Sequence, residues 1–198
     1  MKQQVNSIIR SCYLHMRSIS RIRRYLTMDA AEKLVHAFVT SRLDCNNALL
    51  QGLPDCVLQK LQLVQNNAAR IIAKKRKYDH ITETLINLHW LPIKYRIKYK
   101  VLLLTFKCLR KDEEDKPRAP VYLADLLQPY MPVRSLRPRD NMELVEPNTR
   151  LPTYGDRAFS SCGARLWNEL PSDMKEKQSL GAFKSLLKTH LFQIAYDC

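Results

Sequence analysis

The sequence predicts a mainly α-helical fold, and two features of the chain carry that prediction. Apolar residues recur at the i, i+3, i+4, i+7 spacing of a single helix face in several separate segments. Residues that favour helix N-termini, such as Thr27, Asp55 and Ser179, stand directly before these segments. Because 45% of the 198 residues are hydrophobic, the chain can bury a sizeable core, as one compact domain or two small ones.

Residues 1–55 are predicted to form a helical segment with two parts. The first part, 5–26, is basic and apolar, with a helix-like but irregular pattern. Thr27 or Asp29 can then cap a clearer helix. The apolar face of that helix carries Ala31, Leu34, Val35, Phe38, Val39 and Leu43. A loop at 51–55 ends this segment.

Residues 56–110 are predicted to form basic amphipathic helices. The first begins at Asp55 and runs into four consecutive cations at 74–77, which favour a helix C-terminus because of the macrodipole. A short helix follows Asp79. His89 is assigned a packing or capping role in the turn before Pro92, where the next helix begins.

Residues 111–152 are predicted to form a proline-rich connector. Seven of the ten prolines lie within the 36 residues from Pro117 to Pro152, and such segments favour extended or loop structure. A short strand at 142–145 is an alternative for one part of it.

Residues 153–198 are predicted to form a small C-terminal helical unit. Gly155 is expected to supply a positive backbone dihedral before a helix, and Asp156 to cap that helix. Arg150 and Arg157 can pair with Asp156 or with phosphate, and a structural turn is the favoured interpretation.

Charge is the strongest indication of function. Lys and Arg total 33 against 19 Asp and Glu, which gives a formal net charge of +14 and a pI near 9.7. Such a pI is typical of nucleic-acid binding, because cations displace the counterions condensed on phosphates. Two alternatives remain: a larger protein whose remainder balances the charge, and an anionic membrane surface. No signal peptide or transmembrane span is expected, since no apolar run approaches 18 residues.

Basic clusters are the candidate binding sites. The predicted nucleic-acid-binding residues are Lys74, Lys75, Arg76, Lys77, Lys94, Arg96, Lys98, Arg134, Arg137, Arg139, Arg150 and Arg157. The run at 74–77 is dense enough to contact a phosphate backbone or to act as a nuclear-import signal. A solvated helix end explains the same run equally well.

Two of the other clusters also have competing explanations. The cations at 94–98 interleave with Tyr95 and Tyr99, a mixture that suits single strands because bases stack on aromatic rings. An amphipathic helix with a basic outer face explains that mixture as well. The arginines at 134–139 lie in an extended segment that can track a nucleic-acid backbone or form a flexible linker.

Catalytic motifs are missing from the sequence. It contains no Asp-Asp pair of the kind that holds metal ions in polymerases, no Gly-x-Ser-x-Gly and no zinc-peptidase histidines. The 4 glycines argue against phosphate loops, and the 6 cysteines form no Cys-x-x-Cys pair, which favours reduced and mostly buried thiols. We therefore expect no catalytic residue, metal, cofactor or small-molecule substrate.

Four ordered motifs together resemble a known family. They are Leu88-His89-Trp90-Leu91-Pro92, Arg134-Ser135-Leu136-Arg137, Tyr154-Gly155-Asp156-Arg157-Ala158-Phe159 and Leu166-Trp167-Asn168-Glu169-Leu170-Pro171. They resemble the region just beyond the polymerase core of non-LTR retrotransposon (LINE-type, jockey-like) reverse transcriptases. The resemblance covers nearly the whole chain, most specifically 65–193, and 1–55 look like the helical thumb that packs against primer and template.

The resemblance implies an origin without a catalytic centre. In that family the catalytic aspartates lie in the palm, and neither the palm nor the endonuclease has a counterpart here. The implied function is a non-catalytic C-terminal fragment that binds RNA or DNA in the nucleus or cytoplasm, with a polymerase core in another chain as a possible partner. The alternative is a structural or interaction fragment with no independent activity.

Overall fold

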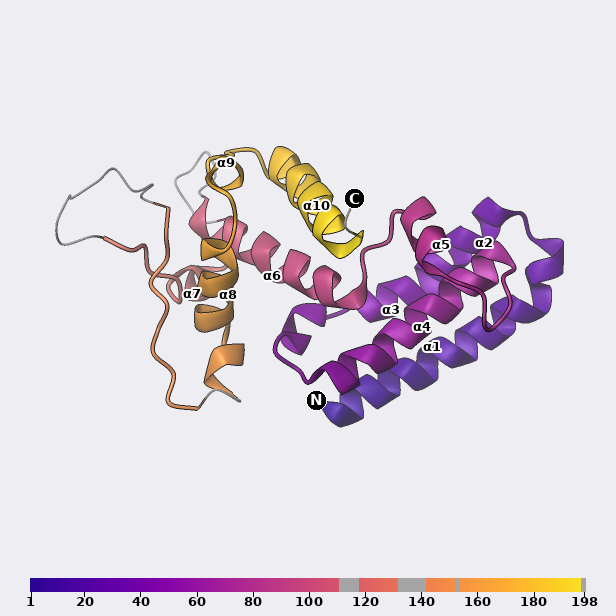
Figure 1. The fold of residues 1–198 in the computed structure, drawn as a ribbon. Helices are drawn as coiled ribbons and strands as arrows, with labels where there is room; N and C mark the ends of the chain where they lie inside the picture. Colours follow the sequence, from indigo (N-terminus) through magenta and orange to yellow (C-terminus); the bar gives the residue numbers. More distant parts are fainter. Residues whose placement is uncertain (111–117, 132–141, 152–153, 197–198) are drawn as a thin grey trace. The chain divides into compact units, whose positions relative to one another are not determined.

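The structure, a computed structural model, describes residues 1–110, 118–131, 142–151 and 154–196. The chain divides into two compact units, residues 1–96 and 97–198 (Figure 1). Both are built from helices, so the prediction of a mainly α fold is confirmed. Instead of the strand suggested at 142–145, the described residues there form a single antiparallel bridge, from Leu144 to Pro129.

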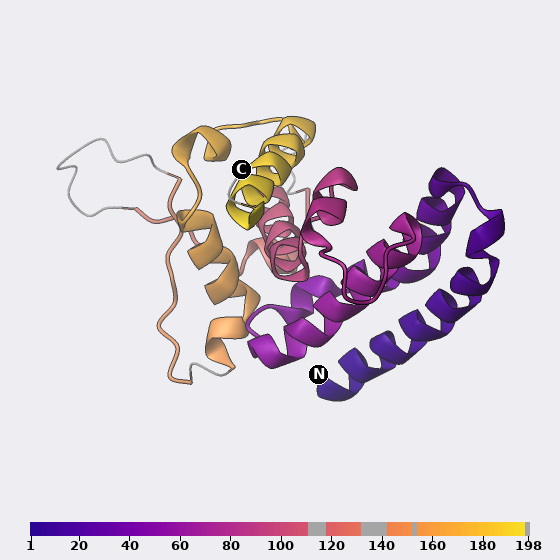
Figure 2. The same ribbon diagram turned by 45° about the vertical axis from the view of Figure 1, so that its right-hand side comes forward.

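Two long helices of the first unit lie side by side and run in the same direction (Figures 1 and 2). They are α1 (Lys2–Ile22) and α4 (Asp55–Ala73). The segment between them returns in the opposite direction as α2 (Met28–Val35), the π-helical η2 (His36–Thr40) and α3 (Ser41–Asp44). The short elements of this unit are η1 (Arg23–Tyr25), η3 (Asn47–Leu50) and α5 (Thr82–Asn87).

The core of the first unit is made by one stripe from each of these helices. On α1 the buried residues are Val5, Cys12, Met16 and Ile19. They are separated by seven, four and three positions, so they lie on one face of the helix despite the irregular apolar pattern. Thr27 caps α2 as predicted, since its Oγ1 accepts a hydrogen bond from the Ala30 N–H at 3.2 Å.

Phe38 does not belong to this core, contrary to the prediction. Its side chain is exposed and stacks on the His15 ring, with centroids 5.3 Å apart. The buried positions are Ala31, Val35, Val39 and Leu43, four residues apart. The wider turn of the π-helix at 36–40 keeps that spacing on one face and leaves Phe38 outside.

His89 forms the turn that ends α5. Its backbone is left-handed, with φ of 51°. The His89 N–H donates to the Ile86 carbonyl, and the Trp90 N–H donates to the Leu85 carbonyl, both at 2.9 Å. This is the Schellman pattern of a helix C-terminus, and the side chains of Leu85 and Trp90 are both buried. The predicted capping role of His89 is thus confirmed.

The unit boundary falls within α6 (Ile93–Leu109). Gln65, fully buried on α4, donates from Nε2 to the Leu91 carbonyl at 2.8 Å. Gln62 Oε1 accepts from the Ile93 N–H at 2.8 Å. These bonds tie the start of α6 to α4, so the structure divides between 96 and 97, whereas the sequence suggested a boundary after 110.

The second unit is centred on three aromatic rings. The rings of Phe106 and Phe183 stack with centroids 4.1 Å apart, and that of Trp167 lies 6.5 Å and 6.0 Å from them. All three side chains are almost completely buried. Besides α6, the helices of this unit are α7 (Val121–Ala124), η4 (Gly155–Arg157), α8 (Phe159–Asn168), α9 (Ser172–Lys175) and α10 (Leu180–Tyr196).

Part of the predicted connector is bound to this second core. Trp167 Nε1 donates to the Met142 carbonyl at 2.7 Å. The Asn168 amide pairs with both the N–H and the carbonyl of Leu144, at 2.9 Å and 3.0 Å. Two residues of the Leu166–Pro171 motif therefore hold the segment at 142–144 against α8.

The predictions for Gly155 and Asp156 were wrong. Gly155 is not among the glycines with positive φ. A larger residue does not fit at this position, because its Cβ would lie 2.5 Å from Thr149 Cβ. The Asp156 carboxylate accepts a hydrogen bond from the Thr149 hydroxyl. Helix α8 begins after Ala158 with no side-chain cap. Thr149 therefore accounts for both residues, by close packing against Gly155 and by a hydrogen bond to Asp156.

Five cysteines lie in the described part of the chain, all as free thiols. Cys12, Cys108 and Cys162 are buried, whereas Cys45 and Cys56 are exposed. Burial raises the pKa of all three buried thiols, that of Cys108 to about 11.

We expect alkylation to separate these two groups. Near neutral pH, iodoacetamide should label Cys45 and Cys56 in the folded protein and spare the buried three, because they are neither accessible nor ionised. Peptide mass spectrometry measures the labelling, with urea-unfolded protein as the control in which all six cysteines of the chain react. Labelling of Cys108 in folded protein as fast as Cys56 would contradict the core described above.

Candidate nucleic-acid interface

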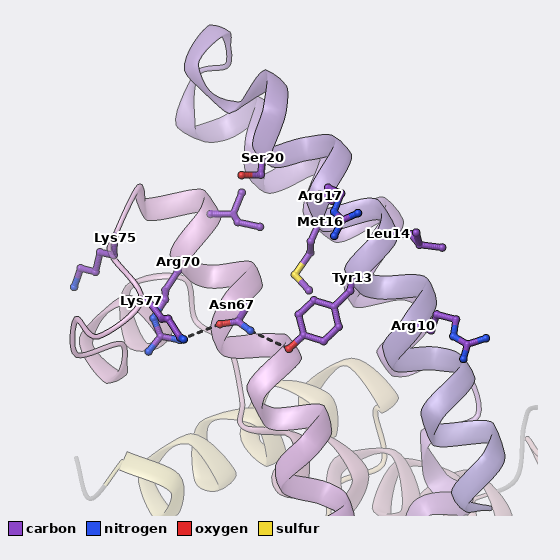
Figure 3. Close-up of a pocket in the computed structure, with 11 residues that line it drawn as sticks. Arg10, Tyr13, Leu14, Met16, Arg17, Ser20, Asn67, Arg70, Lys75 and Lys77 are labelled. Atoms are coloured by element: carbon purple, nitrogen blue, oxygen red, sulfur yellow. Dashed lines mark hydrogen bonds between the residues drawn. The ribbon is translucent and has the colours of Figure 1, made fainter.

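A basic pocket lies on the first unit, against α1, α4 and the turn that follows α4 (Figure 3). Its volume is about 580 Å³. We call it the α1/α4 groove; its lining residues are Arg10, Tyr13, Leu14, Met16, Arg17, Ser20, Asn67, Arg70, Ile71, Lys75 and Lys77. Five of these residues are cations, and no acidic residue is among the described residues of the lining.

A second hollow continues this basic surface past the ends of the two helices. Its volume is about 380 Å³, and it shares Ser20, Arg70, Ile71 and Lys75 with the groove. It adds Arg23, Arg24 and Lys74 to the lining. The cations thus line two adjoining hollows, and a phosphate backbone is a ligand with repeated negative charges.

Arg23 is the structural member of this set. Its side chain is buried, and Nε donates to the Ile71 carbonyl at 2.8 Å. Nη1 donates to the Leu26 carbonyl at 2.8 Å, and Nη2 donates to the Ile72 carbonyl. The last carbonyls of a helix have no partner within the helix, so this guanidinium satisfies the C-terminus of α4 and joins it to the end of α1.

The predicted run at 74–77 forms a turn after α4. Lys74 has left-handed backbone with φ of 53°, and the Lys75 N–H donates to the Arg70 carbonyl at 3.1 Å. The Asp79 carboxylate accepts from the Arg76 N–H at 2.7 Å and so closes the turn. Lys75 and Lys77 line the groove, while Arg76 is exposed outside its lining. The Lys75 ammonium donates to the His80 carbonyl at 3.3 Å and lies 3.9 Å from the Glu83 carboxylate, so its charge is partly committed to the turn.

A chain of hydrogen bonds crosses the groove from α4 to α1 (Figure 3). Arg70 Nη1 donates to Asn67 Oδ1 at 3.3 Å, and Asn67 Nδ2 donates to the Tyr13 hydroxyl oxygen at 3.0 Å. Because a guanidinium can only donate, it fixes which end of the Asn67 amide faces Tyr13. Tyr13 therefore accepts from the protein, and its own proton is available to a ligand.

The groove offers donors to whatever binds it. Guanidinium and ammonium groups can only donate hydrogen bonds, and the Tyr13 hydroxyl can donate its proton while it accepts from Asn67. Arg70 Nη2 donates to the Asp79 carbonyl at 3.3 Å and Nη1 to Asn67, so Arg70 contributes positive charge to the groove. A ligand rich in acceptor oxygens and negative charge, such as a phosphodiester, matches this set.

The other predicted residues lie elsewhere. Lys94 is exposed on α6, Arg96 lies 3.5 Å from the Asp44 carboxylate, and Lys98 is half-buried. None of the three lines the groove. Arg150 and Arg157 belong to the second unit, with Arg157 in η4. Arg134, Arg137 and Arg139 lie outside the described residues.

Three groove cations were not predicted. Arg10 and Arg17 lie seven residues apart on α1 and therefore share one face, which is a signal that the sequence does contain. Arg70 lies in the last turn of α4, four residues before the predicted run. A search for cations at helical spacing, instead of consecutive cations, finds all three.

Neither a metal centre nor a membrane-spanning segment emerges from the described ranges. They contain no cluster of three or more His, Cys, Asp or Glu suited to a metal ion. Within the same ranges, every helix is too short or too polar to cross a bilayer. Comparison with known proteins found no matching family model, no similar curated protein and no similar solved structure.

Replacement of Arg23 by Lys should weaken the first unit. Lysine keeps the charge but lacks the fork that reaches three carbonyls, so two charge-assisted hydrogen bonds are lost. We expect a loss of about 3 kcal/mol in the free energy of unfolding, measured by urea denaturation. Arg24→Lys, at an exposed neighbour, is the matched control. Equal midpoints for the two variants would contradict the role of Arg23.

Replacement of Lys74 by Gly should have the opposite effect. Left-handed backbone is unfavourable for lysine and free of steric cost for glycine, so we expect a gain of about 1 kcal/mol. The urea midpoint, at unchanged slope, measures it. Lys77→Gly, in the same turn without positive φ, should give no gain. A less stable Lys74→Gly variant would show that the lysine side chain stabilises the turn.

Proposed function

We propose that this chain is a non-catalytic, basic nucleic-acid-binding module related to the C-terminal region of LINE-type reverse transcriptases. The observation that carries the binding function is the α1/α4 groove, whose described lining holds five cations and no acid. The net charge of +14 supports the same ligand class. The resemblance of the four motifs supplies the proposed origin, with RNA or DNA as the partner in the nucleus or cytoplasm.

The physical basis of binding is the release of counterions. Each phosphate that a Lys or Arg neutralises frees condensed cations into the solvent, so affinity falls steeply as salt rises. Arg10 and Arg17 are exposed on α1 and have no ion pair in the described structure. Their charges are therefore not committed to the fold, unlike that of Arg23, whose guanidinium is occupied by backbone carbonyls.

A second candidate function is an interaction fragment that packs against another chain, such as a polymerase core. Large apolar side chains are exposed in the second unit, and such surfaces often mark interfaces. They are Val121, Tyr122, Leu126, Tyr130 and Met131, with Met131 83% exposed. Tight binding of nucleic acid by the isolated chain favours the first function, whereas self-association without such binding favours the second.

Removal of two groove charges tests the proposal. Arg10→Gln combined with Arg17→Gln should lower the slope of log affinity against log salt by about 1.4 for single-stranded RNA, if each arginine contacts one phosphate. Fluorescence anisotropy over a salt series measures that slope.

The matched control removes two charges elsewhere. Lys184 and Lys188 are exposed on α10 in the second unit, so Lys184→Gln with Lys188→Gln changes the net charge equally. The slope of this control should stay within error of the unmodified chain. If both double variants reduce the slope equally, the net charge and not the groove determines binding, and the assignment of the site is wrong.

A further inference from the structure

The α1/α4 groove is not lined by cations alone. Tyr13, Leu14, Met16 and Ile71 contribute apolar surface to it, with Tyr13 42% and Leu14 60% exposed. The exposed Tyr13 ring lies among the cations and offers a flat apolar face in addition to positive charge. The groove therefore combines two surfaces, one suited to negative charge and one suited to a flat apolar group.

The Tyr13 ring is held in position before any ligand arrives. Its hydroxyl is fixed by the Asn67 amide, which is in turn fixed by Arg70 (Figure 3). A tyrosine side chain has two rotatable bonds, and the attachment of its distal end restricts both. A partly exposed ring held in this way loses little conformational entropy when a second ring stacks on it.

Beyond the proposed binding function, on which this step rests, we propose that the groove takes one unstacked nucleotide of a single strand. The base lies against the Tyr13 ring, and the adjoining phosphate contacts Arg17 and Arg70. The groove is open to solvent, and its volume of about 580 Å³ is large enough to admit a small organic group. The Tyr13 proton donates to an acceptor oxygen of the same nucleotide.

A single strand fits this groove better than a duplex or a free nucleotide. In a duplex the base faces are stacked on one another, so a duplex offers only phosphates and base edges to the protein. In a single strand each base has a face available for stacking. A free nucleotide uses only the groove, whereas the neighbouring hollow adds Arg24 and Lys74 for a further phosphate of the strand.

The experiment compares ligands that differ in one surface at a time. The full chain is titrated with a short oligouridine, an abasic strand of equal length that keeps the phosphates, a duplex of equal length, and uridine monophosphate. The single strand should bind about tenfold more tightly than the abasic strand, since one stacked base contributes that much. Uridine monophosphate should compete only at far higher concentration.

Variants of Tyr13 assign the difference to this ring. Tyr13→Ala should abolish the preference for the single strand over the abasic strand and leave abasic binding nearly unchanged. Tyr13→Phe keeps the ring, so most of the preference should remain. This second variant keeps the ring's role testable where Tyr13→Ala does not fold. Tyr25→Ala, at an exposed tyrosine 74% accessible and outside the groove lining, is the control and should keep the preference.

The two proposals fail differently. Equal affinity for the single strand and the abasic strand, with a steep salt slope, overturns the nucleotide pocket and leaves the basic module intact. A preference that survives in Tyr13→Ala also overturns the pocket. Absence of salt-dependent binding to all four ligands overturns the proposed function itself.

Discussion

The parallel pairing of α1 and α4 is held at one end by a single buried guanidinium. Arg23 bonds to the last carbonyls of α4 while its own backbone continues the end of α1. Parallel helices bring their C-termini together, and both ends carry partial negative charge. A cation at that point removes the repulsion and satisfies carbonyl groups that would otherwise be buried without donors. The position of every groove residue follows from this pairing.

The same constraint explains why cations collect at this end of the first unit. Arg24, Arg70 and Lys74 lie near the two helix C-termini, where positive charge is favourable whether or not a ligand binds. Arg10 and Arg17 are different, because they project from α1 one turn or more before its end. Helix electrostatics does not account for Arg10 and Arg17. These two arginines are therefore the ones that favour a binding surface over a helix end stabilised by cations.

Local patterns in the sequence were enough to predict the helices. The Thr27 cap, the buried stripe of α4 and the turn at His89 all depend on residues close together in the chain. The groove depends on residues far apart: Tyr13 meets Asn67, and Arg23 meets Ile71, across about fifty positions. Cations at 74–77, or at helical spacing along one helix, can be recognised in the sequence, whereas the pairing of α1 with α4 that brings them together cannot. The prediction for Gly155 was wrong for a different reason, since its small size is required by contact with the nearby Thr149 and not by its own φ.

Lysine footprinting with bound RNA tests the central claim, that the α1/α4 groove and its adjoining turn form the nucleic-acid surface. The full chain is acetylated with and without single-stranded RNA at low salt, and the modified peptides are quantified by mass spectrometry. Protection of Lys74, Lys75 and Lys77, with Lys94 on α6 and Lys184 and Lys188 on α10 unchanged, is the result that the groove predicts. Protection confined to Lys94 or α10, with the turn after α4 still reactive, would place the binding surface elsewhere and contradict it.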